Sequence, residues 1–569
     1  MAEQTGKTSL NNALRKLYQL LILDRRDISA IYLFAILSGL VQLSVPIGIQ
    51  SIIGFVQAAD YSTSIVLLIA LVVIGVFING LLQVRQMQVI EKIEQKIFVR
   101  YAFEFTDRIP KLDIKKLDNY YLPEVMNRFF DTMTLQKGIS KLLLDIPAAA
   151  IQIIFGLTLL SLYHPVFIAF GLFLFLILFL ILRLTAAKGM ETSLRESDYK
   201  YAVAGWLQEM GRTIKTFKFS KGTKLHLEET DRLTTGYLES RTAHFRVLMS
   251  QYWSLISFKT LITAAMLIVG SVLLVNQQLN IGQFIAAEII ILTVIGAIEK
   301  FITSLDKVYD VLTATEKLGK VTNAPIEESG SIDLPSEDKG VSVKFENLSF
   351  GFPSNPSVLN NISFSAMAGQ RIAIMGNSGS GKSMLLRMLT GTYRDFTGNI
   401  FIESIPIQNF TLSSLRNQTG ILLNLQDIFK GSLLHNISMG NNNINITQIT
   451  SIAERLGFID EMQSLPNGFE SILDPAGKRL PKKILQQILL MRALLGNHRL
   501  LLLEDPCNHL APEEKEAVLN CIRQELNATV IISTNDPSVA KVCDKIIVLK
   551  NGTVETTGNW NDLDRMMFE

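Results

Sequence analysis

The chain has 569 residues, a formal net charge of +2 and 48% apolar residues. It is too long for one domain, its near-neutral charge argues against a nucleic-acid-binding protein, and its mean hydropathy of +0.29 is high for a protein that folds in water. Its three cysteines lack C-x-x-C spacing and lie in the C-terminal third, which argues against a disulfide framework or a zinc site.

The segment before residue 28 predicts an amphipathic helix. Apolar residues recur at helical spacing from Leu14 to Leu23, and charged residues flank them. Such a helix lies on a membrane surface with its polar side in water. We therefore assign residues 1–27 to an N-terminal elbow helix on the cytoplasmic surface of a membrane; an ordinary helix end is the alternative.

Six apolar blocks follow, and each has about 20 mainly apolar residues, the length that crosses a bilayer as a helix. They run over residues 28–53, 64–82, 142–163, 165–184, 255–275 and 281–301. Buried helices of a soluble protein are the alternative, which six successive blocks disfavour. The expected fold of residues 28–318 is a membrane α-helical bundle with six transmembrane helices.

The connections between these blocks alternate in length. Links one–two, three–four and five–six are very short, whereas the other two have about 60–70 residues, a helical pattern and many Lys and Arg residues. The positive-inside rule places both long links in the cytosol, and an even number of spans then places both termini there. We also expect the second span to continue as a helix into water and Pro46 to kink the first span.

Glu288 lies inside the sixth block. A membrane-embedded carboxylate usually faces a wet cavity or a partner. Two interpretations stay open: Glu288 lines a pathway, or it forms a structural ion pair, for which Lys259 is the candidate.

After Leu318 the composition turns polar, with a predicted linker over residues 319–340 and an α/β domain over residues 341–569. Within this domain an apolar run at 371–375 predicts a strand, and the pattern from Met384 predicts a helix. The eight residues from Gly376 to Ser383 match G-x-x-x-x-G-K-[ST], the phosphate-binding P-loop. They are Gly376, Asn377, Ser378, Gly379, Ser380, Gly381, Lys382 and Ser383.

The P-loop pattern has a physical basis. Glycines let backbone N–H groups curl around a phosphate, and the dipole of the following helix favours the anion. We expect Lys382 to reach the β- and γ-phosphates of ATP and Ser383 to hold Mg²⁺. The whole segment from Gly376 to Met384 is the predicted nucleotide contact.

The order of six spans, long cytosolic links and a C-terminal P-loop domain resembles a half-size ABC exporter over essentially the whole chain. The membrane part is most similar to bacterial haemolysin- and bacteriocin-type secretion exporters. The resemblance implies the cofactors ATP and Mg²⁺, membrane lipid, a bacterial inner membrane, an exported peptide or protein, and a periplasmic adaptor protein. It also implies a homodimer, or a heterodimer with a second half-transporter, and docking segments near residues 121–128 and 206–215.

The same resemblance assigns further site residues. Phe352 matches the aromatic ring that stacks on adenine, although a core Phe is the alternative. Glu504 matches the carboxylate that faces Mg²⁺, and Asp505 matches the general base but is one methylene shorter than the family's glutamate. Asn424 stands at the lid-glutamine position and Asn535 at the switch-histidine position. Gln426, His435 and His509 lie nearby but off register, and we interpret both histidines as structural.

The signature Leu-Ser-Gly-Gly-Gln is matched by Leu480-Pro481-Lys482-Lys483-Ile484, in a register set by Gly477 and by residues 492–495. Pro481 has neither a hydroxyl nor an N–H group. The two lysines either grip phosphate by charge or are solvated. The next loop has Ala511 where the resemblance leads us to expect an aspartate.

These departures predict Mg-ATP binding with slow or absent turnover, so whether the chain is an ATPase on its own stays open. The leading interpretation is an export subunit. The alternatives are a non-hydrolysing ATP-binding scaffold or gated pore that anchors a secretion complex, and the degenerate half of a heterodimeric exporter.

Overall fold

The computed structural model describes residues 2–57, 63–116, 122–220, 222–352, 355–424, 426–474, 480–524 and 527–562. The chain forms two compact units. The first comprises Met1–Leu112 and Lys116–Ile326, and the second comprises Asp113–Lys115 and Glu327–Glu569. The division at residues 326 and 327 lies inside the segment predicted as a linker.

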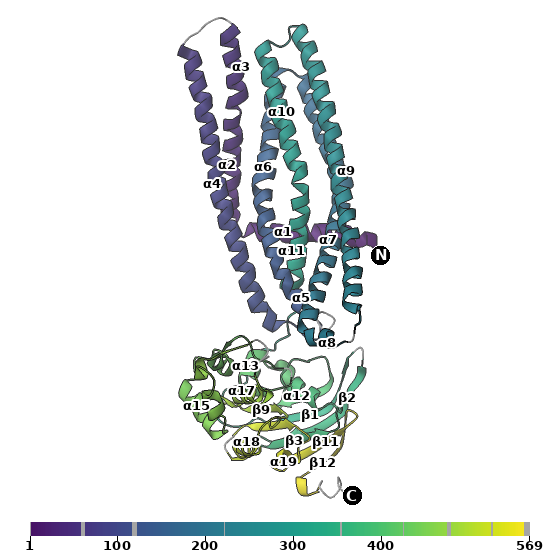
Figure 1. The fold of residues 1–569 in the computed structure, drawn as a ribbon, viewed down its shortest axis with the longest axis vertical. Helices are drawn as coiled ribbons and strands as arrows, with labels where there is room; N and C mark the ends of the chain where they lie inside the picture. Colours follow the sequence, from purple (N-terminus) through teal and green to yellow (C-terminus); the bar gives the residue numbers. More distant parts are fainter. Residues whose placement is uncertain are drawn as a thin grey trace. The chain divides into compact units, whose positions relative to one another are not determined.

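The first unit is a bundle of long helices (Figure 1). It contains α1 (Ala2–Ile22), α2 (Arg25–Gln42), α3 (Ser44–Gln57), α4 (Thr63–Arg108), α5 (Leu122–Asn127), α6 (Asp131–Tyr163), α7 (Val166–Arg212), α8 (Ile214–Phe219), α9 (Leu225–Val275), α10 (Ile281–Thr303) and α11 (Leu305–Thr322). In the described parts of the chain, six helical stretches are long and apolar enough to cross a membrane. The predicted six-span bundle is confirmed.

The helix before the bundle and the first span have the predicted local features. α1 is a separate helix that runs across the bundle axis rather than along it (Figure 1). The first span is broken at Leu43, between α2 and α3. Pro46 lacks an N–H group, and in a continuous helix its ring would clash with the carbonyl of Gln42. The helix is thus interrupted close to Pro46, where the kink was expected.

The long links are continuations of the span helices. α4 continues without interruption to Arg108, α7 to Arg212, and α9 begins at Leu225, well before the apolar block that it contains. The predicted extension of the second span is confirmed. The short connections at His164-Pro165 and at 276–280 also separate helices as expected, whereas residues 58–62 of the first short link lie outside the described residues.

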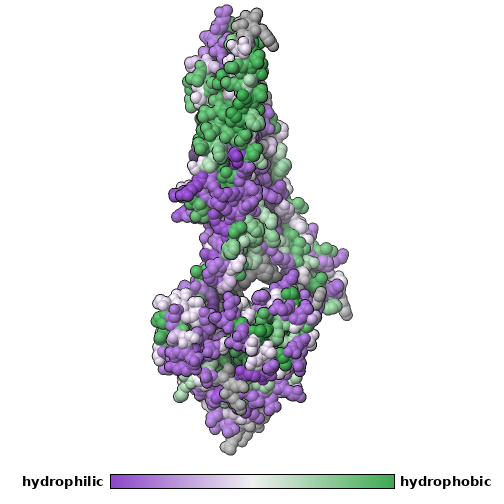
Figure 2. Space-filling view, turned by 90° about the vertical axis from the view of Figure 1, so that its left-hand side faces the viewer, coloured by the Kyte–Doolittle hydropathy of each residue, from purple (hydrophilic) through white to green (hydrophobic). Residues whose placement is uncertain are grey.

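Small residues let the helices of the bundle approach closely. A Cβ atom on Gly39 would lie 2.4 Å from Ile151 Cγ2, and one on Gly138 would lie 2.1 Å from Val311 Cγ2. Glycine at helix contacts is typical of membrane bundles, where close backbone packing replaces the hydrophobic effect. On the face seen in Figure 2, hydrophobic side chains form a broad band over the upper bundle, which gives way to a hydrophilic band below it.

The ion-pair interpretation of Glu288 is wrong with respect to Lys259. The Lys259 ammonium lies 3.2 Å from Glu299 Oε2 instead. Among the described residues, the buried Oε1 atom of Glu288 has no hydrogen-bond partner. The other interpretation, that Glu288 lines a pathway, stays a prediction.

The second unit contains two larger sheets with helices around them. A six-stranded sheet has the order β12-β11-β3-β10-β9-β6, and a four-stranded sheet has the order β2-β1-β4-β5. The strands are β1 (Val343–Phe352), β2 (Asn355–Ala366), β3 (Arg371–Gly376), β4 (Thr397–Ile402), β5 (Ile405–Pro406), β6 (Thr419–Leu422), β9 (Leu500–Glu504), β10 (Thr529–Ser533), β11 (Lys545–Lys550) and β12 (Thr553–Gly558), and β7 (Gly431–Ser432) pairs separately with β8 (Ile472–Leu473). The predicted α/β domain is confirmed.

Helices cover the six-stranded sheet and fill its connections. They are α12 (Lys382–Leu389), α13 (Leu412–Asn417), α14 (Leu433–Ser438), α15 (Ile446–Arg455), α16 (Ile459–Gln463), α17 (Lys482–Leu494), α18 (Pro512–Gln524) and α19 (Pro537–Ala540). Strands β6, β9, β10, β3 and β11 are mutually parallel. Their carboxyl ends therefore meet at one edge of the sheet, the usual place for a ligand in an open α/β sheet.

Candidate nucleotide-binding site

The predicted site residues come together because they follow neighbouring strands. The P-loop follows β3, Asn424 follows β6, Asp505 follows β9, and Asn535 follows β10. In the register of the sheet, Ser533 is paired with Glu504 and with Ile374. The topology thus places four separate sequence segments at one edge of the sheet.

The P-loop has the expected strand–loop–helix setting. Gly376 has φ +143° and Gly381 has φ +101°, backbone conformations that side chains oppose. A Cβ atom would lie 2.1 Å from the Leu549 carbonyl oxygen at the first position and 2.6 Å from Leu359 Cδ2 at the second. Close packing and backbone conformation therefore require glycine at both positions. The loop can then keep a conformation that wraps around a phosphate.

The loop also offers groups that suit an anion. The first N–H groups of α12 have no carbonyl partner within their own helix. The Ser380 hydroxyl is buried and lacks a hydrogen-bond partner among the described residues. The Lys382 ammonium donates to the carbonyl oxygens of Gly376 and Asn377, the second at 3.0 Å. Burial lowers the pKa of Lys382, an effect that the carboxylates of Asp505 and Glu504 oppose. This cradle fits a nucleotide phosphate.

The predicted metal-binding groups are in contact. The Ser383 hydroxyl donates to Glu504 Oε1, and the backbone N–H of Asn424 donates to Glu504 Oε2 at 2.9 Å. Hydroxyl and carboxylate oxygens suit Mg²⁺, which usually takes only one or two protein ligands together with phosphate and water. The Ser383 and Glu504 oxygens therefore fit Mg²⁺ that is shared with a phosphate. Among the described residues no group of three or more His, Cys, Asp or Glu side chains could hold a metal.

Asp505 follows Glu504 at the end of β9, and its backbone N–H donates to Ser533 O at 2.9 Å. Burial and the neighbouring Glu504 carboxylate raise the pKa of Asp505, partly offset by the Lys382 ammonium. The short side chain thus lies at the edge of the sheet, at the position predicted for the general base.

Asn535 contacts the P-loop through its amide oxygen. The backbone N–H of Gly376 donates to Asn535 Oδ1 at 3.3 Å. A neutral amide at this place can brace the loop but cannot carry the positive charge of a protonated histidine. The contact joins the end of β10 to the start of the loop.

Phe352 belongs to a small aromatic group at the end of β1. Its ring lies edge-on to Phe350 at 5.1 Å and to Tyr393 at 5.9 Å between centroids, and it is half-buried. This position is compatible with both interpretations of Phe352, so adenine stacking stays a prediction.

The two lysines of the signature segment have different surroundings. Gly477 lies outside the described residues, and Pro481 is the N-cap of α17. Lys482 is exposed. The Lys483 ammonium is instead 2.6 Å from Glu461 Oε1 and 2.9 Å from Glu514 Oε1. Lys482 thus fits the solvated interpretation, whereas Lys483 ties α17 to α16 and α18 within its own domain.

Sequence reasoning missed Glu514, which organises this region. Glu514 is 6% exposed; its carboxylate also accepts from Gln487 Nε2 at 2.7 Å and from the Ala511 N–H at 2.8 Å. The second contact is half of a capping box, with Glu514 at the third position of α18. Pro512 followed by Glu513 and Glu514 is a helix-start pattern that could have revealed it.

Two of the off-register residues, Gln426 and His435, have structural contacts, and the structural interpretation of His509 stays a prediction. Gln426 Oε1 accepts from the Leu423 N–H at 3.1 Å. His435 Nδ1 lies 2.9 Å from Ser432 Oγ, at the start of α14. Neither side chain is directed at the Ser383–Glu504 pair by these bonds.

Two family models match the chain. The ABC transporter transmembrane region matches residues 28–298, and the ABC transporter model matches residues 359–508. Together they cover more than half of the chain. The chain belongs to the ABC transporters. It has one membrane region and one ATP-binding domain in its described parts, the organisation of a half-size ABC exporter.

Similar proteins agree with this assignment. The alpha-hemolysin translocation ATP-binding protein HlyB of Escherichia coli O157:H7 is 28% identical over 360 residues, which are 63% of this chain and 51% of that protein. A putative export ATP-binding/permease protein of Rickettsia bellii is 28% identical over 362 residues, which are 63% of this chain and 62% of that protein. The ABC transporter thus spans about half to three fifths of the length of these curated relatives.

A solved structure shows the same fold. The structure of a bacterial Atm1-family ABC exporter with ATP bound has a TM-score of 0.84 to this chain at 19% sequence identity. The match covers 95% of this chain and 97% of that chain. The resemblance to half-size ABC exporters is confirmed at the level of fold and domain content.

Proposed function

We propose that this ABC transporter is an export subunit of a bacterial inner membrane that binds Mg-ATP and hydrolyses it slowly or not at all. The observation that carries the proposal is the contrast within one site. Lys382, Ser383 and Glu504 keep the groups that hold phosphate and metal. The hydrolytic positions carry Asp505 and Asn535, which are a short base and an uncharged amide.

The proposed domain layout follows the sequence boundaries. Residues 1–27 form an elbow helix, 28–318 the transmembrane domain, 319–340 a linker and 341–569 the nucleotide-binding domain. Both termini and both long links lie on the cytoplasmic side, since the links are rich in Lys and Arg. Segments near 121–128 and 206–215 pass nucleotide-dependent movement to the spans. The first segment contains α5, and its residue 121 lies outside the described residues.

The proposed assembly is a dimer of half-transporters, either two copies or one copy with a second half-transporter. In a homodimer, both sites combine a weak base with a signature segment that contains Pro481. With an intact partner chain, one site has this chain's Asp505 and the other has its Lys483-anchored signature segment. Each arrangement contains an incomplete site, so the chain can bind ATP without hydrolysing it at a normal rate.

The proposed cargo is a peptide or protein, delivered with the help of a periplasmic adaptor protein. The support is the name of the haemolysin translocation relative, a transfer of function by likeness rather than by site chemistry.

The test measures binding and hydrolysis separately on the full chain in lipid. We expect saturable Mg²⁺-dependent binding of a fluorescent ATP analogue, and vanadate-sensitive phosphate release far below the ~10 s⁻¹ of a median enzyme. Lys382→Ala should weaken the binding by about 10–100-fold, while Lys482→Ala, at an exposed lysine, should leave it intact. Turnover of tens per second by the purified chain alone would overturn the proposal.

A second candidate function is a non-hydrolysing ATP-binding scaffold or gated pore that anchors a secretion complex. The neutral Asn535 favours it, because an uncharged amide at the switch position suits a site that holds ATP without cleaving it. Export that continues with Lys382→Ala would support the scaffold. ATP turnover that appears only after co-expression of a second half-transporter with intact motifs would instead support the heterodimer.

A further inference from the structure

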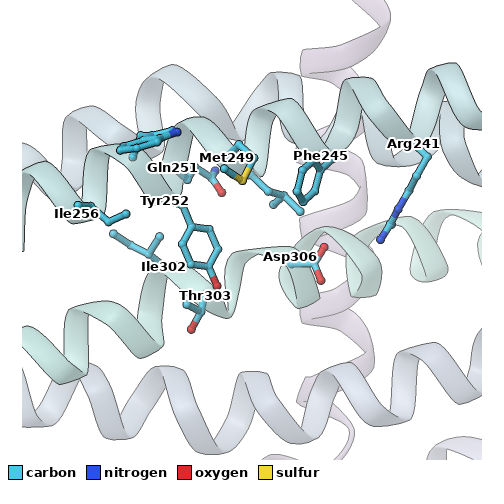
Figure 3. A pocket seen from close by; sticks show the side chains of 11 residues that line it. Arg241, Phe245, Met249, Gln251, Tyr252, Ile256, Ile302, Thr303 and Asp306 are labelled. Atoms are coloured by element: carbon cyan, nitrogen blue, oxygen red, sulfur yellow. The ribbon is translucent and has the colours of Figure 1, made fainter.

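A large pocket opens in the helical unit, away from the nucleotide site. It has a volume of about 480 Å³ and lies between α9 and the junction of α10 with α11. Figure 3 shows its two different ends: Arg241 and Asp306 lie toward one end, while Tyr252, Ile256 and Ile302 lie toward the other. The pocket is therefore amphipathic along its length.

Exposed aromatic rings line the pocket from its polar side to its apolar end. Trp253 is 63% exposed, Phe245 54% and Tyr252 44%, and Phe245 lies near Asp306 (Figure 3). The predicted fifth span begins at residue 255 and the predicted sixth span ends at residue 301, so Tyr252 and Trp253 stand at the expected cytoplasmic boundary of the membrane. Trp and Tyr favour this boundary because they combine an apolar ring with a polar atom. The apolar end thus faces the acyl region of the inner leaflet.

The polar end carries two opposite charges, and both side chains can form further hydrogen bonds. Arg241 Nη1 lies 2.9 Å from Glu196 Oε1, which leaves other N–H donors of the five on the guanidinium. Asp306 Oδ2 lies 3.1 Å from the Lys307 ammonium. Its Oδ1 is 3.7 Å from the buried His244 Nε2, which has no hydrogen-bond partner among the described residues. A carboxylate has about four acceptor sites, so Asp306 can accept from a ligand as well.

This combination selects the class of ligand. A purely anionic head would meet the Asp306 carboxylate, and a purely cationic head would meet the Arg241 guanidinium; like charges in one site oppose binding. A head with both a phosphate and a primary ammonium satisfies both side chains, through charge-assisted hydrogen bonds. An attached acyl chain covers the aromatic end.

We propose that this pocket binds a zwitterionic phospholipid of the cytoplasmic leaflet, with the phosphate at Arg241, the primary ammonium at Asp306 and an acyl chain along Phe245, Tyr252 and Trp253. Phosphatidylethanolamine has this chemistry. The site is independent of the ATP-binding residues and of how fast the ABC transporter hydrolyses ATP.

Trp253 supplies the reporter for the test. The chain has three tryptophans, so Trp206→Phe with Trp560→Phe leaves Trp253 as the only one. This full chain is placed in nanodiscs of phosphatidylcholine that contain increasing fractions of lipids with brominated acyl chains. Quenching of Trp253 is compared for phosphatidylethanolamine and phosphatidylglycerol with identical chains. We expect phosphatidylethanolamine to saturate the quenching at about tenfold lower mole fraction.

Matched variants connect the preference to the polar end. Asp306→Asn and Arg241→Gln should each remove the preference for phosphatidylethanolamine. Asp310→Asn is the control for the first, because Asp310 also binds Lys307, at 2.8 Å, but does not line the pocket. Arg232→Gln is the control for the second, because Arg232 pairs with Glu229 on the surface of the same helix. Both controls should keep the preference.

Three outcomes would overturn the inference. Quenching that rises with mole fraction equally for both lipids shows that Trp253 meets only bulk lipid. Quenching that responds to protein concentration rather than lipid shows that a second copy of the chain covers the pocket. Displacement of brominated phosphatidylethanolamine by soluble phosphoethanolamine alone, at the same concentration as the lipid, shows a site for the free head group.

Discussion

The P-loop and the signature segment each place a lysine at the start of a helix, but the two lysines have different partners. Lys382 donates to neutral carbonyl oxygens of its own loop. Lys483 is held between the carboxylates of Glu461 and Glu514. A phosphate carries more charge than a carbonyl and can replace it as a partner, whereas two carboxylates already neutralise Lys483. A lysine near a nucleotide is thus available to phosphate only if its resting partners are weak.

The largest effect should come from rebuilding the hydrolytic side. The variant combines Asn424→Gln, Asp505→Glu and Asn535→His with Ser-Gly-Gly at residues 481–483. Since misplacing a reacting group by about 1 Å can cost about 100-fold in rate, we expect kcat for ATP to rise by about 100-fold or more. Phosphate release by the full chain in lipid measures this.

The control for this rebuilding is the same set of changes in the Lys382→Ala background, which should show no gain. If the rebuilt chain with Lys382 intact hydrolyses ATP no faster than the starting chain, the cause of slow turnover lies outside these positions. The contrast between the P-loop and the signature segment would then have no bearing on catalysis.

The next effect concerns affinity for ATP. Lys382→Ala removes a charge-assisted hydrogen bond to phosphate worth about 1.5–3 kcal/mol, which predicts about 10–100-fold weaker binding. Lys483→Ala should change the affinity by less than about twofold, because its ammonium is already paired. Titration with a fluorescent ATP analogue compares the two variants. Equal weakening by both would show that Lys483 leaves its carboxylates to bind phosphate.

The comparison of the two lysines also shows what sequence can and cannot reveal. The P-loop was predictable because its glycines, Lys382 and Ser383 are adjacent in sequence and have one possible arrangement. The six spans, the break near Pro46 and the long helical links were predictable from local patterns of the same kind.

The non-local contacts were not predictable. One partner of Lys483 lies 31 residues away at Glu514, on a helix that only the fold brings near, so neither interpretation of Lys483 included this ion pair. The Lys259–Glu299 contact was not predictable for the same reason. Glu288 and Glu299 lie on one helix, and only the packing of that helix decides which of them meets Lys259. Local patterns specify elements, whereas ion pairs depend on how the elements pack.

A smaller effect concerns stability. Lys483→Met leaves the nearly buried Glu514 carboxylate without its cation, although Gln487 and the Ala511 N–H still donate to it. Because Lys483 is about one-third exposed, water screens part of the loss. We expect destabilisation of about 1–2 kcal/mol. Lys482→Met at the exposed neighbour should stay within about 0.5 kcal/mol. Thermal melting of the nucleotide-domain transition in the full chain measures both, and equal melting temperatures would contradict the proposed tie between helices.

The smallest effect concerns the two neighbouring carboxylates at the end of β9, Glu504 and Asp505. Burial and the adjacent Glu504 raise the pKa of Asp505, so the folded chain holds that proton more tightly than the unfolded chain does. Folding therefore loses stability as the pH rises from the unfolded pKa of about 3.9 through the folded pKa. Asp505→Asn removes this penalty, so its melting temperature should exceed that of the starting chain slightly at pH 7 and match it near pH 4.

Glu504→Gln is the matched change on the binding side of the same strand end. Its carboxylate accepts from Ser383 Oγ and from the Asn424 N–H, and a neutral amide accepts more weakly and binds Mg²⁺ less well. Glu504→Gln should therefore weaken Mg²⁺-dependent ATP binding, whereas Asp505→Asn should preserve or strengthen it, because one negative charge near the phosphates is gone. If Asp505→Asn weakened binding as much as Glu504→Gln, Asp505 would belong to the phosphate- and metal-holding groups, and the division between a retained binding side and an altered hydrolytic side would fail at this strand.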